Sequence, residues 1–270
     1  MLLALDIGNT NVVIGLFDGD HLLHHWRLGS QRHATSDEIA ATIYAYFQMS
    51  GLATSVIDEA IIACVVPPLL PVFERTCQKL FQCAPVVVGH GTRSGMPIRV
   101  DNPPEVGADR IVNAVAAHHM LGAPVIAIDF GTAITFDCVS RAGEFVGGVI
   151  FPGLLVALDA LTSRASKLSS VEVVKPPQVI GRNTVHMLQS GMVFGFAGMV
   201  DQTVAKIREE LGRDAPVVAT GGLAHLVASE SKAIERVEPF LTLQGLRLIH
   251  ERNRDAPTGR RGAQHRKETA

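Results

Sequence analysis

Two apolar strands in this chain each carry an aspartate near their end. "LLALDIGNTN", residues 2–11, holds Asp6, and "VIAIDFGTAIT", residues 125–135, holds Asp129 at the matching position. A carboxylate buried without a compensating partner is costly. The chain must therefore fold so that a positive or proton-donating group reaches each of these strand ends.

These two segments form an internal repeat. In each, an apolar strand leads into a Gly-containing polar turn and then a second apolar strand, so that Gly8 matches Gly131. A repeat with a domain-sized period indicates a duplicated structural unit rather than a solenoid. We expect an α/β fold in which each unit is a mixed sheet flanked by helices, with a cleft between the two units.

Periodicity and capping signals predict alternating strands and helices in both halves. In the first half we expect strands at residues 2–7, 12–17, 19–28, 59–66 and 85–89, and helices at 36–49, 69–82 and 108–121. In the second half we expect a strand–turn–strand unit over 124–140, a third strand over 143–153 that ends in a turn, and a helix at 154–162. One long or broken helical stretch over 184–211, a strand that runs into a Gly-Gly turn over 216–222, a helix after it and a short helix near 243–250 are expected to follow. Ser36 is the expected N-cap of the first helix.

The length of 270 residues is enough for two units of about 130 residues each. The predicted boundaries are 1–121 for the N-terminal domain, 122–251 for the C-terminal domain and 252–270 for a tail. The tail carries no apolar pattern, which predicts that it is disordered.

Charge and composition argue against several classes of protein. A formal net charge of −2 gives no electrostatic case for binding nucleic acid or an anionic membrane. No run reaches the roughly 18 apolar residues of a membrane span. The four cysteines form no CxxC pair, so we expect reduced thiols in a cytoplasmic protein and no zinc site.

The turn that follows each aspartate has the chemistry of a phosphate site. Gly8 lets the backbone approach a ligand without a Cβ, and the N–H groups and polar side chains of residues 9–11 can surround phosphate oxygens. Asp6 and Asp129 repel phosphate, so a cation such as Mg²⁺ or a monovalent ion must lie between. The alternative interpretation is a plain hairpin whose aspartate caps its own turn.

A further turn lies downstream in "VVATGGL", residues 217–223. Gly221 and Gly222 there would let adenine or ribose lie close to the backbone. An ordinary strand-to-helix turn explains this segment alone equally well.

Paired phosphate hairpins with a Gly-Gly segment for adenosine resemble the acetate and sugar kinase/Hsp70/actin superfamily. More narrowly, the chain resembles the type III pantothenate kinases from residue 2 to about residue 250. The segments that carry this resemblance are "DIGNTN" (6–11), "NPPEVGADR" (102–110), "DFGTAIT" (129–135), "GGVIFPG" (147–153), "GRNTVHMLQSG" (181–191) and "TGG" (220–222). The resemblance implies two ribonuclease H-like domains, each a mixed sheet flanked by helices, with a nucleotide cleft between them.

The same resemblance implies an enzyme that transfers phosphate from ATP to pantothenate, the first step of coenzyme A synthesis. It implies Mg²⁺ and a monovalent cation, K⁺ or NH₄⁺, as cofactors, and a homodimer with the active site near the subunit interface. The residues implied to bind ATP are Asp6, Ile7, Gly8, Asn9, Thr10, Asn11, Val12, Val13, Thr132, Gly221 and Gly222. Those implied to bind pantothenate are Gly107, Ala108, Asp109, Arg110 and Thr184, and the implied metal ligands are Asp129 and Asp6.

The residue chemistry is consistent with these roles. Phosphoryl transfer needs positioning and charge neutralisation more than covalent help. Asp109, implied to be the general base, begins a predicted helix and could accept the proton of a primary alcohol. Arg110 could hold the carboxylate of pantothenate by a two-pronged contact. The alternative is that Asp109 caps the helix and pairs with Arg110 on the surface.

One position departs from the family pattern, and two other functions stay open. Val100 stands where many members have Tyr, so one wall of the substrate site differs. A kinase for another small hydroxyl substrate would use the same machinery. A non-enzymatic nucleotide-binding regulator of the same fold is the other alternative, and its support is the mildly basic tail.

Overall fold

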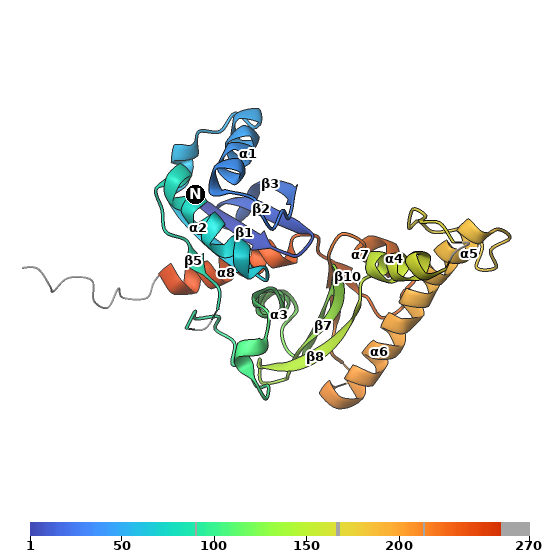
Figure 1. Cartoon of the computed structure of the whole chain (residues 1–270). Helices are drawn as coiled ribbons and strands as arrows, with labels where there is room; N and C mark the ends of the chain where they lie inside the picture. The colour runs from blue at the N-terminus through green and yellow to red at the C-terminus, as the bar shows by residue number, and fades with distance from the viewer. Residues whose placement is uncertain (90, 166–167, 213, 255–270) are drawn as a thin grey trace, which may run out of the picture.

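Two five-stranded sheets with one topology form the frame of the protein (Figure 1). The computed structural model describes residues 1–89, 91–165, 168–212 and 214–254. The first sheet has the order β3-β2-β1-β4-β5 and consists of β1 (Leu2–Ile7), β2 (Asn11–Asp18), β3 (His21–Gly29), β4 (Glu59–Cys64) and β5 (Val86–Val87). The second has the order β8-β7-β6-β9-β10 and consists of β6 (Val125–Phe130), β7 (Ala133–Val139), β8 (Phe145–Pro152), β9 (Val217–Thr220) and β10 (Arg236–Val237).

The strand directions are also the same in the two sheets. In each, the first three strands form an antiparallel meander. The fourth strand pairs in parallel with the first, and the fifth pairs in parallel with the fourth. This is the arrangement of a ribonuclease H-like unit, so the predicted fold class and the duplication are confirmed. The division of the chain at residue 121/122 stays a prediction.

The helices lie where the sequence predicts them, with differences at their ends. They are α1 (Ser36–Met49), α2 (Leu70–Phe81), α3 (Ala108–Leu121), α4 (Leu154–Arg164), α5 (Thr184–Ser190), α6 (Phe196–Leu211), α7 (Ala224–Ala228) and α8 (Leu241–Arg254). A π-helical turn, Gly191–Gly195, joins α5 to α6, so the expected helical stretch over 184–211 is continuous. No helix in the described part of the chain is long and apolar enough to cross a membrane.

A few element boundaries differ from expectation. The N-cap of α1 is Thr35 rather than Ser36, because Thr35 and Glu38 form a reciprocal capping box. The strand expected over 85–89 is reduced to β5, and the one expected over 59–66 ends at Cys64 as β4. The segment 19–28 begins, as expected, with a turn, and the segment 216–222 is, as expected, a strand that runs into the Gly-Gly turn.

The predicted tail begins too early, because α8 extends to Arg254. Its last turn is bound to a distant loop at residues 93–94. Arg93 N–H donates to Asn253 Oδ1 at 3.1 Å, and Arg252 donates to the carbonyl of Ser94. Residues 252–254 are therefore helical, and residues 255–270 lie outside the described residues.

The side chains of the central strands alternate between two cores. In β1, Leu3, Leu5 and Ile7 pack with α1 and α2 on the outer face, whereas Leu2 and Ala4 pack in a middle layer with α3 and α8. In β6 the alternation repeats, with α6 and α7 on the outer face and α3 and α8 on the inner one. Both aspartates continue the inner-facing series, so their carboxylates point into the middle layer between the sheets.

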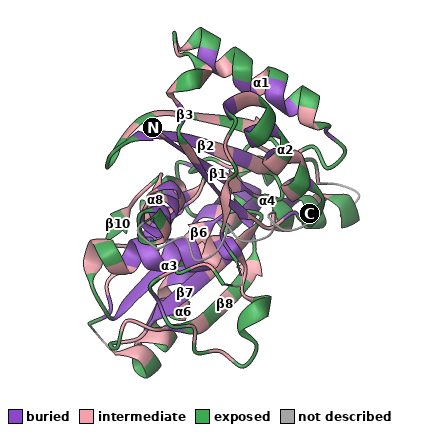
Figure 2. Cartoon of the chain, turned by 90° about the vertical axis from the view of Figure 1, so that its left-hand side faces the viewer, coloured by how far each residue is buried: buried purple, intermediate pink, exposed green. Residues whose placement is uncertain are grey.

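Helices α3 and α8 fill this middle layer, and Figure 2 shows both of them largely buried. They pack against each other, with α3 also contacting β6 and β7 and α8 contacting β1, β2 and β4. They approach each other closely at Gly245, where a Cβ would lie 2.2 Å from the carbonyl oxygen of Val112. The two halves are thus joined by one shared apolar layer.

Gly245→Ala should destabilise the protein because the added methyl has no room against α3. Overpacking of this kind costs about 1–3 kcal/mol and exceeds the gain in helix propensity of up to about 1 kcal/mol. Urea unfolding measures the change. The matched control is Gly198→Ala in α6, where a Cβ would meet no atom within 4 Å and should stabilise slightly. Equal stabilisation by both substitutions would contradict the close packing of α3 on α8.

Candidate active site

The two predicted phosphate turns meet in space. Thr10 Oγ1 lies 2.8 Å from Thr132 Oγ1, although the two residues are far apart in the chain. The first turn contains residues 8–10 and the second only residues 131–132, so the second hairpin is one residue shorter. The structure therefore brings together the two segments that the repeat predicted to act as a pair.

Backbone hydrogen bonds shape both turns. The N–H of Gly8 donates to Asn11 O, and the N–H of Gly131 donates to Ala133 O, each at 3.0 Å. The side chains of the flanking residues Ile7 and Val12 lie in the outer core. Only the backbone of those two residues remains available for a ligand, whereas Asn9 and Thr10 are exposed.

Three partly buried carboxylates gather beneath these turns, those of Asp6, Asp109 and Asp129. Removal from water is the largest cause that raises the pKa of each. It raises the pKa of Asp129 to about 6, with the Asp109 charge adding to the shift. Burial raises the pKa of Asp6 well above its ordinary value, and the charges of Asp109 and Asp129 raise it further. The three groups thus act on one another electrostatically across both halves of the chain.

Asp109 lies in the first turn of α3. Its Oδ1 accepts a hydrogen bond from the N–H of Arg110 at 2.8 Å, which partly offsets the rise in its pKa. A Cβ on Gly107 would lie 2.5 Å from the same oxygen, so the missing side chain leaves room for the carboxylate. The side chain of Ala108 packs in the middle core. Only its backbone can therefore reach a ligand.

Arg110 has a partner that the sequence did not indicate. Its Nε donates to Asp137 Oδ1 at 2.6 Å, and its guanidinium lies 5.6 Å from the centre of the Phe145 ring. The alternative of a surface pair between Arg110 and Asp109 is therefore wrong. Nη2 of Arg110 is buried without a hydrogen-bond partner among the described residues, so part of the guanidinium fork remains unpaired.

Asp137 and Gly153 belong to this region but received no role from the sequence. Asp137 is fully buried, and burial raises its pKa to about 7 against the opposing effect of Arg110. The signal for it was a third aspartate in an apolar strand. Gly153 donates its N–H to Thr132 O at 2.9 Å, and a Cβ there would lie 2.3 Å from Gly131 O. Its small size lets the chain pack on the second turn.

The Gly-Gly turn follows β9 and lies directly beside Asp129. Gly221 has a φ of +97°, and a Cβ on it would lie 2.6 Å from both Asp129 Oδ1 and Phe130 O. Two oxygens therefore border a space that a side chain would fill. Among the described residues, no three His, Cys, Asp or Glu side chains form a complete metal-binding group.

Thr184 is the one predicted site residue that the structure places elsewhere. It begins α5, which Asn183 caps by accepting from the N–H of His186 at 2.9 Å. Figure 1 shows α5 at the end of α6, well away from α3, the helix whose first turn carries Asp109. Within one chain, Thr184 and Asp109 do not meet.

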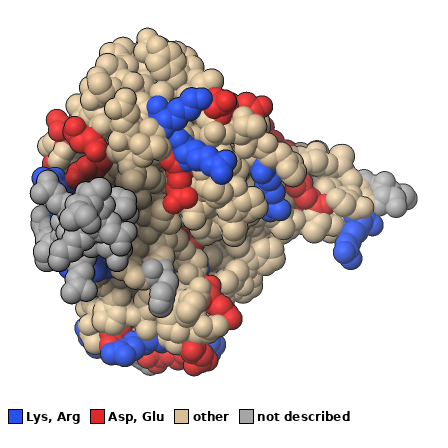
Figure 3. Space-filling model, turned by 60° about the vertical axis from the view of Figure 1, so that its left-hand side comes forward, with Lys and Arg blue, Asp and Glu red and all other residues tan. Residues whose placement is uncertain are grey.

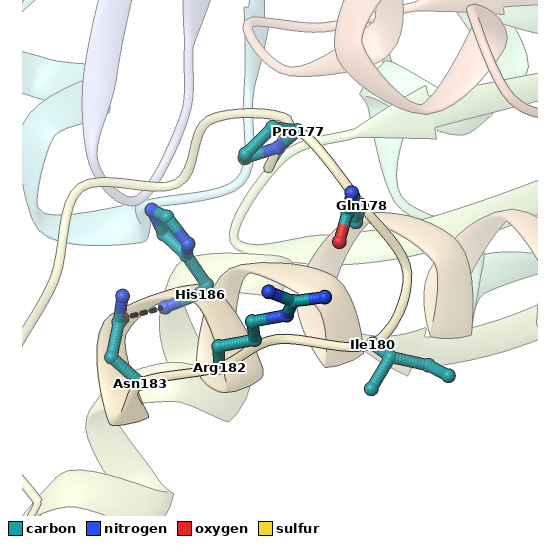
Figure 4. A pocket seen from close by; sticks show the side chains of 6 residues that line it. All are labelled: Pro177, Gln178, Ile180, Arg182, Asn183 and His186. Atoms are coloured by element: carbon teal, nitrogen blue, oxygen red, sulfur yellow. Dashed lines mark hydrogen bonds between the residues drawn. The ribbon is translucent and has the colours of Figure 1, made fainter.

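An open pocket of about 260 Å³ lies next to α5 and is separate from the carboxylates. Figure 4 shows the loop carrying Pro177 and Gln178 arching over the side chains of Arg182 and His186. Its remaining lining residues are Ile180 and Asn183.

Two ribonuclease H-like units that meet through glycine-containing hairpins, with carboxylates beneath them, define the class of the protein as the acetate and sugar kinase/Hsp70/actin superfamily. Solved structures agree on the fold. A chain from Campylobacter jejuni assigned to the Baf family of transcriptional activators superposes with a TM-score of 0.58 at 17% identity, covering 94% of this chain and 100% of that one. Component A of (R)-2-hydroxyglutaryl-CoA dehydratase from Acidaminococcus fermentans gives 0.54 at 13% identity, covering 92% and 95%.

Sequence comparison gives the family. The model of the type III pantothenate kinase family matches residues 2–206. Relatives named type III pantothenate kinase are 51% identical in Myxococcus xanthus and 50% identical in Geobacter sulfurreducens. Each covers 94% of this chain, and the matches span 99% and 100% of the relatives. The chain belongs to the type III pantothenate kinase family.

Asp129→Asn should stabilise the unliganded protein at pH 8 and not at pH 4. Because the pKa of Asp129 is raised from 3.8 to about 6, the native state binds its proton more tightly than the unfolded chain does. The stability from this group is fully present below pH 3.8 and is lost as the pH rises through about 6. The amide avoids that loss, which we expect to be about 1–3 kcal/mol at pH 8.

Urea unfolding in chelator at both pH values measures the difference. The control is Asp214→Asn. Asp214 and its partner Arg141 are both exposed, so this substitution should change stability little at either pH. A stability difference for Asp129→Asn that is the same at both pH values would show that this carboxylate is not strained by burial.

Proposed function

We propose that this chain phosphorylates pantothenate with ATP to give 4′-phosphopantothenate, the first step of coenzyme A biosynthesis. The observation that carries the proposal is the identity of about half of all residues, over 94% of the chain, with relatives named type III pantothenate kinase. The three carboxylates beneath two facing hairpins support it, because a kinase needs charged groups at the reacting phosphate.

ATP is proposed to lie with its phosphates against both hairpins. The contact of Thr10 with Thr132 supports this, since one phosphate group could be reached from both turns. The backbone of residues 6–13 and the side chains of Asn9 and Asn11 supply further donors. Gly221 and Gly222 would then take the adenosine end.

Cations are proposed at the two strand-end aspartates, with Mg²⁺ near Asp6 and K⁺ or NH₄⁺ at Asp129. Asp129 Oδ1 and Phe130 O border the same space beside Gly221, and hard cations prefer oxygen ligands of this kind. Such ions neutralise phosphate charge when they are bound.

Asp109 is proposed as the general base for the hydroxyl of pantothenate. Burial raises its pKa, and a carboxylate with a raised pKa is a better proton acceptor near neutral pH. Backbone groups of Gly107 and Ala108 at the start of α3 would orient the substrate, together with Arg110, whose guanidinium Asp137 holds in place.

A homodimer is proposed because exposed apolar side chains concentrate in one region. Among the described residues, ten of the thirteen exposed large hydrophobic side chains lie between residues 146 and 187. They are Val146, Ile150, Leu155, Val156, Leu161, Val174, Val179, Ile180, Val185 and Met187. They belong to β8, α4, α5 and the segments between them, and exposed apolar side chains in this number favour an interaction surface in this part of the chain. A second copy that covers it would bring its own Thr184 toward the site, where the same chain cannot.

The alternatives have less support. On the face shown in Figure 3, acidic and basic side chains are interspersed rather than gathered into a basic patch, which does not favour a nucleic-acid-binding regulator. The likeness to a Baf family chain concerns the fold alone at 17% identity. Four cysteines without a disulfide agree with an enzyme of the cytoplasm.

An ADP-release assay with purified protein tests the proposal directly. ADP should form only with pantothenate present, should require Mg²⁺, and should form faster in K⁺ or NH₄⁺ than in Na⁺. Other hydroxy acids and sugars in the same assay test whether another substrate is preferred. ATP binding without pantothenate-dependent ADP would overturn the assignment.

Asp109→Asn should lower kcat by about 10²- to 10⁴-fold, since the amide cannot accept the substrate proton. Binding of ATP, measured by calorimetry, should change little. The control is Asp20→Asn in the exposed turn between β2 and β3, which should leave kcat unchanged. An unaltered kcat for Asp109→Asn would rule out its role as base.

A mixed dimer tests whether Thr184 acts from the second copy. Asp109→Asn and Thr184→Glu chains, each inactive alone, are co-expressed with different tags and purified as the heterodimer. In a two-fold dimer with shared sites, one site then has both groups intact, and activity should recover to about half of wild type. No recovery, with the dimer verified by size, would show that both residues serve one chain's site.

A further inference from the structure

Arg27 has no role in the function proposed above, yet it lies in line with Asp6. In the first sheet, Asp6 of β1 pairs with Val13 of β2, and Val13 pairs with Arg27 of β3. Directly opposed residues on neighbouring strands point to the same face of a sheet. Arg27 therefore faces the same side as Asp6, toward the second half of the protein.

The backbone around Arg27 is fixed to the first phosphate turn. Ser30, the residue directly after β3, donates its N–H to Thr10 O at 2.9 Å and its hydroxyl to Gly8 O at 2.6 Å. The carbonyl of Arg27 accepts from the hydroxyl of Tyr46 at 3.3 Å. The strand that carries the arginine thus has a set position relative to the turn, while the side chain itself is exposed.

The guanidinium reaches the other half of the protein. Nη1 of Arg27 lies 3.7 Å from the position that a Cβ on Gly222 would take. It therefore extends from the first sheet to the Gly-Gly turn of the second, across the opening between the two halves. Among the described residues, its side chain makes no ion pair and no hydrogen bond.

The repeat shows that this arginine is particular to the first unit. In the second sheet the matching row runs from Asp129 through Thr135 to Ile150. The position that holds a guanidinium in one unit holds an apolar side chain in the other. Of these two matching rows, the one in the first sheet carries a permanent positive charge and the one in the second sheet does not.

We propose that Arg27 binds the phosphate chain of ATP from the side of the first sheet. A guanidinium that lies between a phosphate turn and a Gly-Gly turn can donate two parallel hydrogen bonds to phosphate oxygens. This inference rests on the proposed function only in taking ATP as the nucleotide. The competing role is local, with Arg27 offsetting the Asp6 charge; Arg27 does lower the pKa of Asp6, but as the smallest of the named causes.

Calorimetric binding of ATP and of adenosine to the full chain, with Mg²⁺ and without pantothenate, separates these roles. Arg27→Ala should weaken ATP binding by about 10- to 100-fold, because charge-assisted hydrogen bonds to phosphate are lost. Its affinity for adenosine should stay within about twofold. Arg27→Lys restores the charge without the fork and should give an intermediate affinity for ATP. Arg75→Ala, an exposed arginine of α2, is the matched control and should bind ATP as wild type does.

Other outcomes would overturn the proposal. Equal weakening of ATP and adenosine would place Arg27 at the base or at the Gly-Gly turn, and unchanged ATP affinity with altered stability would leave only the local role. Thermal unfolding of each variant verifies that it is folded. The binding measurements contain no pantothenate, so their outcome does not depend on the substrate of the enzyme. Wild-type protein that binds ATP in these measurements but releases no ADP in the assay with pantothenate would count against the proposed function alone. Wild-type protein that binds no ATP would refute both.

Discussion

Carboxylates withdrawn from water at the inner ends of two matching strands are the constraint on which this structure depends. Asp6 and Asp129 point inward because they continue the alternation that puts apolar neighbours into the middle layer. Their pKa values rise as a result. The protein therefore holds an electrostatic cost in its unliganded state, and the cations proposed above would decrease that cost. At these two residues, burial of the carboxylate lowers the stability of the unliganded fold and at the same time favours the binding of a cation.

The duplication places like groups face to face, but the two units are not equivalent. The first unit has a longer turn and carries Arg27 in its edge strand, β3. The second unit has a shorter turn, on which Gly153 packs. Such differences let one symmetric frame hold a molecule without symmetry. Asp109, the proposed general base, differs again, since it comes from α3 in the middle layer and not from either hairpin.

Much of this arrangement could be predicted from the sequence. Alternation of apolar residues gave the strands, and the repeated aspartate and glycine gave the facing hairpins. What the sequence did not show depends on cross-strand register and on contacts between distant segments. In the sequence, Asp137 is one more residue of an apolar strand, and its contact with Arg110 depends on the packing of α3 against β7. The alignment of Arg27 with Asp6 depends on the register of three strands. Likewise, the length of α8 depends on its bonds to the loop at residues 93–94.

The position of α8 has a consequence for synthesis on the ribosome. This helix is the last described element, yet it covers the inner face of the sheet that emerges first. While the chain grows, the apolar inner surface of β1, β2 and β4 therefore stays uncovered until α8 has been translated. The N-terminal sheet completes its core only after nearly the whole chain has left the exit tunnel, and nascent chains that stop early expose that surface to chaperones and proteases.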